Sequence, residues 1–397
     1  MHEVWGMAAL WLGLALVATL LSIWFRIATA LSEIVVGTVA QLLIGAVIGT
    51  TLGSDVPWIK FLSGTGAIVL TFLAGAELDP VVFKVKWKEA TAIGLISFLA
   101  PFLGCTAMAY YALSWSVRAS WLAGVALSTT SVAVVYAVML ELGLNKTEFG
   151  KTVLAACFIT DLGTVISLGL IFAPFTVRTA IFVAVGITLF VVLPYLTPWF
   201  FRRYGGRPSE LEAKYLLLIL FGLGSLAVWA DSEAVLPAYM VGMVLAGTVG
   251  KDHVLIRRLR TLTFGLLTPF YFIRAGSYVS VPAIFAAPVA LAVLFMAKMI
   301  TKIIGVYPAT KVYKYAQKEG IYTTLLMSTG LTFGSIAALF GLSHQIIDQR
   351  QYSILVVVVI GSAVVPTLIA NAFFIPHYLL PKKEKELSLE TASVTKE

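Results

Sequence analysis

Long apolar segments follow one another along most of the chain, and short polar connections separate them. A membrane-spanning helix needs about 20 mostly apolar residues, and each segment approaches or exceeds that length. The pattern predicts thirteen spans, at about residues 4–24, 34–52, 61–78, 90–113, 120–140, 149–173, 179–200, 214–230, 234–250, 263–280, 284–310, 321–341 and 353–380. An odd number of spans places the two chain ends on opposite sides of the membrane.

Composition excludes a soluble globular protein, because 59% of the 397 residues are apolar and only 12% are charged. The first span is not a cleavable signal, since its apolar run is too long and is flanked by Glu3 and Arg26. Cys105 and Cys157 lie inside apolar runs, and the four histidines show no ligand spacing. We therefore expect no resident metal and no cofactor.

The basic residues predict which side each connection faces. Of the 28 Lys and Arg residues, 21 fall in connections after odd-numbered spans or in the tail, four fall after even-numbered spans and three lie inside spans. By the positive-inside rule, the N-terminus faces outward and the C-terminus lies in the cytoplasm, as expected for a multi-pass protein of the cell (inner) membrane. The net charge of +8 is thereby explained without a nucleic-acid partner. Residues 381–397 form a short polar tail, which predicts a disordered cytoplasmic end.

Asp161 is the acidic residue at the centre of a long apolar span, 149–173; Glu77 lies at the end of another span, and the remaining acids fall in or near connections. A charge at mid-membrane costs roughly 2.5–3.5 kcal/mol, so such residues usually line an ion or proton path. The alternative is a structural carboxylate that ties helices together through hydroxyl or backbone donors.

Two spans have interruptions at corresponding places in the two halves of the chain. The first contains Leu127-Ser128-Thr129-Thr130-Ser131-Val132, and the second contains Ser328-Thr329-Gly330-Leu331-Thr332-Phe333-Gly334-Ser335. Hydroxyls satisfy backbone groups where a helix unwinds, and glycine permits the unwinding. Paired broken helices indicate a transport site near the bilayer midplane. Close helix packing through small residues is the alternative interpretation.

Three basic residues lie inside spans. Lys298 and Lys302 are four residues apart and share one helix face. A lysine at this depth needs a carboxylate or a water-filled cavity, and Asp161 is the central carboxylate available. Snorkelling toward the cytoplasm is the alternative, and it suits Lys302 better than Lys298. Arg274 has no obvious acidic partner, so we expect it to bridge to backbone carbonyls.

Several motifs together resemble those of the monovalent cation/proton antiporters, on the branch of the NapA-type Na+/H+ and KefC-type K+/H+ antiporters. The resemblance extends over about residues 33–380. It rests on Phe72-Leu73-Ala74-Gly75-Ala76-Glu77-Leu78-Asp79, on Thr130-Ser131-Val132 through Glu141-Leu142-Gly143, on Ala155 to Asp161, and on Thr301-Lys302-Ile303-Ile304-Gly305. Many electrogenic members carry two adjacent aspartates in the ion-binding helix, whereas this chain has Thr160 before Asp161. Gly330-Leu331-Thr332-Phe333-Gly334 departs from the family's more polar, charged motif.

The resemblance implies an all-α membrane protein of two inverted repeats with crossed broken helices. Its core domain would comprise spans at about 90–173 and 284–380, and its dimerisation or scaffold domain spans at about 1–89 and 200–283, with a linker helix at about 179–200. The protein would form a homodimer in the bilayer. Lys302 would be the family's lysine and the charge partner of Asp161, with Lys298 as the other candidate. Movement of the core against the scaffold would expose Asp161 alternately to each side.

These observations predict a secondary antiporter that exchanges Na+, or K+, for protons. Asp161 would bind either a proton or a partly dehydrated cation, and hard cations prefer oxygen ligands. The other predicted site residues are the hydroxyl residues Thr129, Thr130, Ser131 and Thr160, and, from the second broken helix, Gly330, Thr332 and Gly334. A single carboxylate predicts one proton per cation, and therefore electroneutral exchange.

Three other functions remain to be weighed against this one. A K+/H+ efflux antiporter shares every feature named above. A Na+-coupled symporter of an organic solute could use the same crossed helices, but it would need a larger cavity than one aspartate provides. An intramembrane aspartyl protease needs two carboxylates that share a site. Because only one is central here, we do not expect an enzyme.

Overall fold

The structure is a computed structural model that describes residues 2–25, 28–47, 51–76, 80–144, 147–172, 176–207, 209–230, 232 and 234–379. Within these ranges the chain is helical and forms no strand. The predicted tail at 381–397 and the end of the third-span motif, residues 77–79, lie outside the described residues.

The helices follow the predicted apolar segments in order. They are α1 (His2–Phe25), α2 (Thr29–Val47), α3 (Pro57–Ala76), α4 (Pro80–Ala107) with the π-helix η1 (Met108–Ala112), α5 (Val117–Ser128), α6 (Val132–Glu141), α7 (Glu148–Phe172), α8 (Val177–Tyr204), α9 (Leu211–Trp229), α10 (Val235–Leu245), α11 (His253–Leu262), the π-helix η3 (Thr263–Leu267), α12 (Thr268–Ser277), α13 (Val281–Phe285), α14 (Pro288–Val312), α15 (Gln317–Met327), α16 (Thr332–Ser343), α17 (Gln349–Phe373) and η4 (His377–Leu379).

Ten helical segments of the described residues are long and apolar enough to cross a membrane. The other three predicted spans correspond to the interrupted pair α5–α6, to α10, and to α12 with the π-helix before it. At 1.5 Å per residue, the 11 residues of α10 extend only about 16 Å, which is shorter than the hydrocarbon core of a bilayer. The all-α class is therefore confirmed, whereas the number of spans stays a prediction.

Helix α2 begins earlier than predicted and therefore contains an acidic residue, Glu33. It begins at Thr29 instead of residue 34, so Glu33 lies in its second turn and is only 2% exposed. The expectation that every acid other than Asp161 and Glu77 falls in or near a connection was therefore wrong for this residue. The sequence pattern ended the apolar run at the carboxylate, but the helix continues through it because neighbouring helices cover that face.

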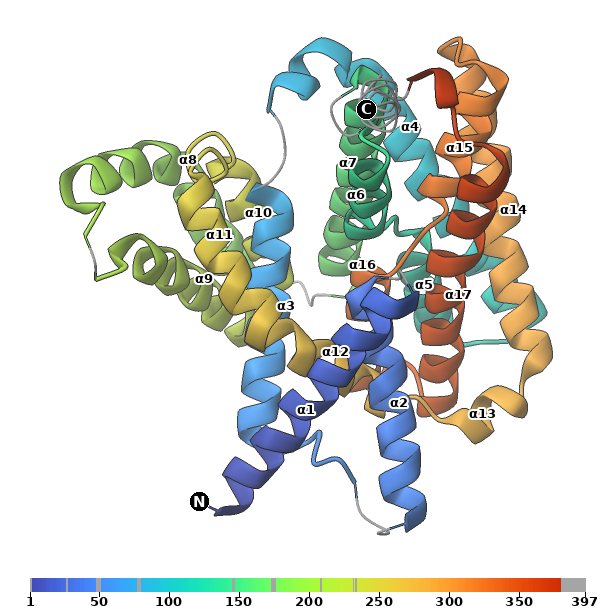
Figure 1. The fold of residues 1–397 in the computed structure, drawn as a ribbon, viewed down its shortest axis with the longest axis horizontal. Helices are drawn as coiled ribbons and strands as arrows, with labels where there is room; N and C mark the ends of the chain where they lie inside the picture. Colours follow the sequence, from blue (N-terminus) through green and yellow to red (C-terminus); the bar gives the residue numbers. More distant parts are fainter. Residues whose placement is uncertain are drawn as a thin grey trace, which may run out of the picture.

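The helices pack into two groups, which Figure 1 shows side by side. One group comprises α1–α3 and α8–α12, in which α3 packs on α10 and α2 packs on α12. The other comprises α4–α7 and α13–α17, in which α4 packs on α5, α7 and α14, and α16 packs on α5 and α17. The division into a core domain, a scaffold domain and a linker helix at about 179–200 stays a prediction, as do their separate roles in transport.

Glycine allows a close crossing of α3 and α10 in the first group. A Cβ on Gly75, part of the third-span motif, would collide with the Tyr239 carbonyl oxygen on α10. A Cβ on Gly242 would likewise meet the Phe72 carbonyl oxygen on α3. The two backbones therefore touch, and the glycine of this motif serves helix packing between α3 and α10.

Candidate ion-binding site

The two interrupted helices cross each other at their breaks, as the sequence predicts. Helix α5 ends at Ser128 and α6 begins at Val132, while α15 ends at Met327 and α16 begins at Thr332. The Ser131 amide donates to the Thr329 carbonyl oxygen at 3.0 Å, and the Thr130 hydroxyl donates to the Met327 carbonyl oxygen at 2.8 Å. Backbone groups that have no partner within their own helix at one break are thus hydrogen-bonded by groups of the other break.

The two breaks share the same pattern of side-chain hydrogen bonds. Ser128 and Thr129 donate their hydroxyls to carbonyls of α5, those of Val125 and Ala126. At the second break, the Ser328 and Thr329 hydroxyls donate to the carbonyl oxygens of Thr324 and Leu326. A Ser-Thr pair therefore caps each first half-helix, which is what two related repeats would show.

Asp161 lies in the middle of α7, the helix that packs against both breaks. Its side chain is 1% exposed, and its Oδ1 atom has no hydrogen-bond partner among the described residues. One turn earlier on the same face, the Cys157 sulfur lies 3.5 Å from the Met327 sulfur at the end of α15. The structure therefore places an unsatisfied carboxylate oxygen beside the crossing.

Tyr239 of α10 closes this region from the other helix group. Its hydroxyl donates to the Phe158 carbonyl oxygen of α7 at 3.1 Å, and its ring stands edge-on to Phe333 of α16 at 5.7 Å. No sequence pattern singled out this residue, because one aromatic residue in an apolar run is ordinary. Tyr239 is therefore one contact between the first helix group and α7, the helix that carries Asp161.

Lys302 reaches the crossing from α14. Its ammonium donates to the Ser97 hydroxyl at 2.8 Å and to the Thr130 hydroxyl at 3.0 Å. It does not form an ion pair with Asp161 within 4.0 Å, although the two groups interact electrostatically. Ser97 lies inside the predicted span 90–113, where a single hydroxyl gave no reason to select it. The family-like Gly305 packs its backbone against Ala100 of α4, which holds α14 close enough for this reach.

Thr160 and Ser131 have other partners in the structure. The Thr160 hydroxyl donates to the carbonyl oxygens of Gly94 on α4 and Ala156 on its own helix, at 3.1 and 3.0 Å. The structure therefore turns Thr160 toward α4 and does not bring it to the breaks. The Ser131 hydroxyl accepts from the Val134 amide at 3.4 Å, as a cap of α6.

The glycines of the second break leave room for neighbouring groups and supply no side-chain ligand. A Cβ on Gly334 would come within 2.9 Å of the Ala126 carbonyl oxygen, so glycine lets α16 approach α5. A Cβ on Gly330 would meet the Lys298 amino group. Thr332 is the first residue of α16 and lies next to the break.

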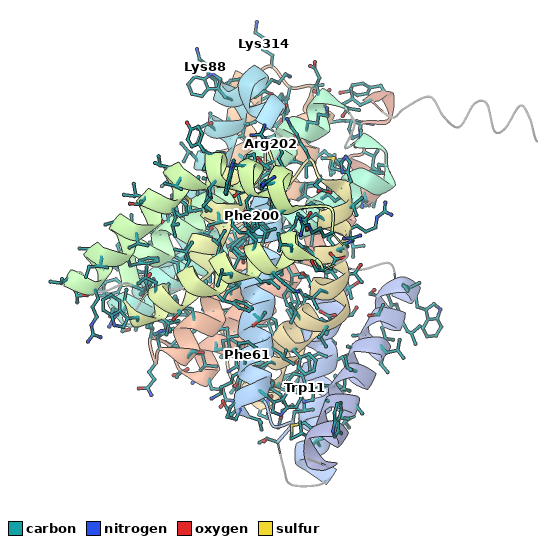
Figure 2. The ribbon with its side chains drawn as sticks, turned by 90° about the vertical axis from the view of Figure 1, so that its left-hand side faces the viewer. Trp11, Phe61, Lys88, Phe200, Arg202 and Lys314 are labelled. Carbon is teal, nitrogen blue, oxygen red and sulfur yellow. The ribbon has the colours of Figure 1, made fainter. Side chains whose placement is uncertain are left out.

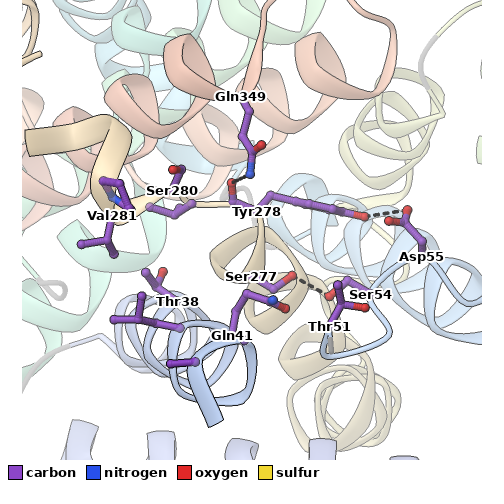
Figure 3. Close-up of a pocket in the computed structure, with 15 residues that line it drawn as sticks. Thr38, Gln41, Thr51, Ser54, Asp55, Ser277, Tyr278, Ser280, Val281 and Gln349 are labelled. Carbon is purple, nitrogen blue, oxygen red and sulfur yellow. Dashed lines mark hydrogen bonds between the residues drawn. The ribbon is translucent and has the colours of Figure 1, made fainter. Parts of the chain in front are cut away.

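A second polar network lies away from the crossing, around a pocket of about 560 Å³. Arg274 of α12 donates to the Ser54 carbonyl oxygen at 2.9 Å and to the Tyr278 hydroxyl at 3.0 Å. Tyr278 in turn donates to Asp55 at 3.0 Å, and Lys60 pairs with Asp55 at 2.9 Å. Figure 3 shows Tyr278 extended across the pocket to Asp55. The prediction that Arg274 bridges to a backbone carbonyl is confirmed.

The comparisons with known proteins agree with this architecture. The sequence profile of the family "Sodium/hydrogen exchanger, transmembrane" matches residues 12–375, so the chain belongs to that family, a family of integral multi-pass membrane transporters. The relative described as "Probable Na(+)/H(+) antiporter 3" of Methanocaldococcus jannaschii is 24% identical over 376 residues, covering 89% of this chain and 95% of its own. The "Na(+)/H(+) antiporter" of Enterococcus hirae is 25% identical over 351 residues, covering 84% of this chain and 91% of its own.

A solved structure has the same fold. The sodium proton antiporter MjNhaP1 of Methanocaldococcus jannaschii superposes with a TM-score of 0.69 at 15% sequence identity, over 94% of this chain and 97% of its own. At that identity the likeness concerns the fold alone.

Proposed function

We propose that this protein exchanges Na+ for protons across the membrane by alternating access around Asp161. The observation that carries the proposal is the unsatisfied, fully buried carboxylate oxygen beside two crossed helix breaks. A buried carboxylate needs a partner, and either a proton or a monovalent cation supplies one. The names of the relatives from Methanocaldococcus jannaschii and Enterococcus hirae support Na+ over K+ as the cation.

The predicted hydroxyls already make hydrogen bonds in the structure, and each must still offer a lone pair if it is to bind the cation. Thr130 is shared between Met327 and Lys302, and Thr129 donates to Ala126. A hydroxyl that donates one bond still has lone pairs for a cation. We infer that Thr130, which already lies between the crossing and Lys302, is the first hydroxyl to join Asp161 in the cation shell.

Alternating exposure requires the two helix groups to move against each other. The group α4–α7 with α13–α17 would carry the site, and the group α1–α3 with α8–α12 would form the scaffold of a homodimer. Tyr239 packs between the groups beside Asp161, so it would slide or separate during the cycle. Cross-linking of cysteines placed on α1 or α8 tests the dimer, since both helices expose most of their surface.

The predicted orientation has support from the position of the lysines. Figure 2 shows Lys88 and Lys314 at the same end of the molecule, as the charge pattern requires for two cytoplasmic connections. The first helix begins at the opposite end in Figure 1. Accessibility of cysteines introduced at these positions to an impermeant reagent in intact cells would test the orientation.

The exchange would be electroneutral, because one carboxylate trades one proton for one cation of the same charge. A second titrating group would move net charge, and the membrane potential would then contribute about 2.3 kcal/mol per charge per 100 mV. The test uses proteoliposomes with the membrane potential clamped by K+ and valinomycin and with Na+ as the driven ion. An exchange equilibrium that follows the clamp would contradict one-for-one exchange.

A further inference from the structure

The two cysteines of the chain are both buried in helices, but their surroundings differ. Cys105 of α4 and Cys157 of α7 are each 0% exposed, and neither forms a disulfide. The Cys157 thiol donates to the Met327 sulfur at 3.5 Å, whereas the described residues give Cys105 no hydrogen bond to a second sulfur. Cys157 and Met327 therefore form a sulfur pair inside the protein, beside the crossing of the broken helices.

Thiol and thioether sulfurs are soft ligands. They select soft cations such as copper(I), whereas hard cations prefer oxygen. In the part of the chain that the structure describes, no three side chains of His, Cys, Asp or Glu gather to hold a metal ion, so a zinc-type site is not indicated there. A soft monovalent cation needs fewer charged ligands than a divalent one, and one cysteine with one methionine suits it.

The spacing of the two sulfurs leaves one side of such an ion open. A metal–sulfur bond is about 2.3 Å long, as it is for zinc. An ion bonded to both sulfurs at their separation of 3.5 Å would make a sulfur–ion–sulfur angle of roughly 100°. This bent arrangement leaves room for a third ligand on the side away from the two sulfurs.

Asp161 is positioned to be that third ligand. It follows Cys157 by four residues on α7, so the two side chains share one helix face. The two groups interact electrostatically, and the Asp161 Oδ1 atom has no hydrogen-bond partner among the described residues. Met327 is the last residue of α15, which packs on α7. The three candidate ligands thus come from the helix of the ion site and from the break beside it.

The charges of this group balance when one monovalent cation is added. Lys302 interacts electrostatically with both Cys157 and Asp161. A thiolate and a carboxylate carry two negative charges, and the Lys302 ammonium and a monovalent cation carry two positive charges. Cys157 is 0% and Asp161 1% exposed, and an unbalanced charge is costly in such a place. A monovalent ion is therefore favoured over a divalent one.

We propose that Cys157, Met327 and Asp161 form a binding site for a soft monovalent cation, Ag+ or Cu+, beside the crossed breaks. Binding forms a bond between the ion and the Cys157 sulfur, and the thiol proton leaves to the solvent. Met327 and Asp161 bind through lone pairs, and no electron is transferred. The ion would occupy the carboxylate that Na+ uses and so block exchange; this consequence rests on the proposed function, whereas binding itself does not.

Titration of the purified protein with silver nitrate, in detergent and without chloride, tests the site directly. Calorimetry should show one tight site per chain. Cys157→Ser and Met327→Leu should each weaken that site by about tenfold or more, because even groups behind the ligands contribute 10–100-fold to metal affinity. Cys105→Ser is the matched control, since it removes an equally buried thiol and should leave the affinity unchanged.

X-ray absorption at the silver edge distinguishes a three-ligand site from a single reactive thiol. Silver bound to the wild type should have two sulfur neighbours, and silver bound to Met327→Leu should have one. Without Ag+, Met327→Leu should unfold near the wild-type temperature, because the exchange conserves volume. One sulfur neighbour in the wild type, or an Ag+ affinity that Cys157→Ser leaves unchanged or that Cys105→Ser lowers equally, would overturn the proposal.

Transport measurements test the link to the ion site. In proteoliposomes, the Ag+ concentration that halves Na+-driven proton movement should rise about tenfold or more in Cys157→Ser and stay unchanged in Cys105→Ser. Each variant is compared with itself without Ag+, and protein-free vesicles report any leak that Ag+ causes. Tight binding without inhibition would overturn the assignment of Asp161 as a ligand. If the wild type shows no exchange, the proposed function fails, while the binding and absorption results still test the sulfur site.

Discussion

The crossing of the broken helices and the network around Arg274 are both polar regions in an apolar protein, yet they are satisfied differently. At the network, Arg274, Tyr278, Asp55 and Lys60 form a continuous chain of hydrogen bonds and one ion pair. At the crossing, Asp161 and Lys298 are fully buried and each retains an atom without a hydrogen-bond partner among the described residues.

This difference indicates that the polar groups of the network stabilise the fold, whereas those at the crossing serve transport. A chain of satisfied groups joins α12 to the loop before α3 and gains nothing from a further ligand. A buried carboxylate oxygen without a partner is costly unless something binds it during the working cycle. We therefore expect substitutions at the crossing to affect transport, and substitutions in the network to affect stability.

The largest expected effect follows from Asp161→Asn, which keeps the shape of the side chain and removes its charge. Na+-driven proton movement in proteoliposomes should fall to background, while the purified protein remains folded. Asp252→Asn is the matched control, because asparagine caps a helix as well as aspartate and Asp252 caps α11. Substantial exchange by the Asp161 variant would remove this residue from the proposed site.

Lys302→Gln should shift the pH dependence of transport. Loss of a nearby positive charge favours the neutral carboxyl over the carboxylate, so the transport optimum should move to higher pH. The pH profile of Na+-driven exchange measures the shift. Lys298→Gln is the comparison on the same helix face, and it should leave the optimum in place even where it lowers the rate. An optimum that moves only with Lys298→Gln would mean that Lys298 is the charge partner.

Arg274→Met should lower stability and leave the exchange mechanism intact. The variant removes two charge-assisted hydrogen bonds, to the Ser54 carbonyl and to Tyr278, and a loss of about 2 kcal/mol is expected. Thermal unfolding in detergent measures the loss, with Arg274→Lys as the variant that keeps charge without the planar fork. If the Arg274→Met protein were as stable as the wild type but had an altered Na+ affinity, the network would have a role in transport and not in stability.

Asp55→Asn should have the smallest effect. Hydrogen bonds from Lys60 and Tyr278 hold the pKa of the Asp55 carboxyl below its usual value of 3.8, although partial burial opposes them. The stabilisation is therefore present above that pH and is lost as the pH falls through the lowered pKa. Because the group is largely exposed, the difference from wild type at pH 7 should be about 0.5 kcal/mol or less. Unfolding measured from pH 7 down to strongly acidic solution should show the stabilities of the wild type and the variant becoming equal at the acid end.

Much of the architecture could be predicted from the sequence. Apolar length fixed the helical class and the order of the helices, because only helices satisfy their own backbone in lipid. The hydroxyl and glycine clusters located both breaks, and a central aspartate marked the helix beside them. Glu33 was missed because a polar residue ends an apolar run in sequence even where the helix continues.

The partners of each polar group were decided only by the tertiary structure. The sequence placed Lys298 and Lys302 on one helix face, and a motif resemblance favoured Lys302 as the partner of Asp161. Only the structure shows that the Lys302 ammonium donates to the hydroxyls of Ser97 and Thr130 and that the Lys298 amino group lies beside Gly330. Thr160 is adjacent to Asp161 in the chain but faces Gly94, since successive helical residues point about 100° apart. Periodicity determines which residues are buried, whereas the atoms that surround them depend on helices hundreds of residues away.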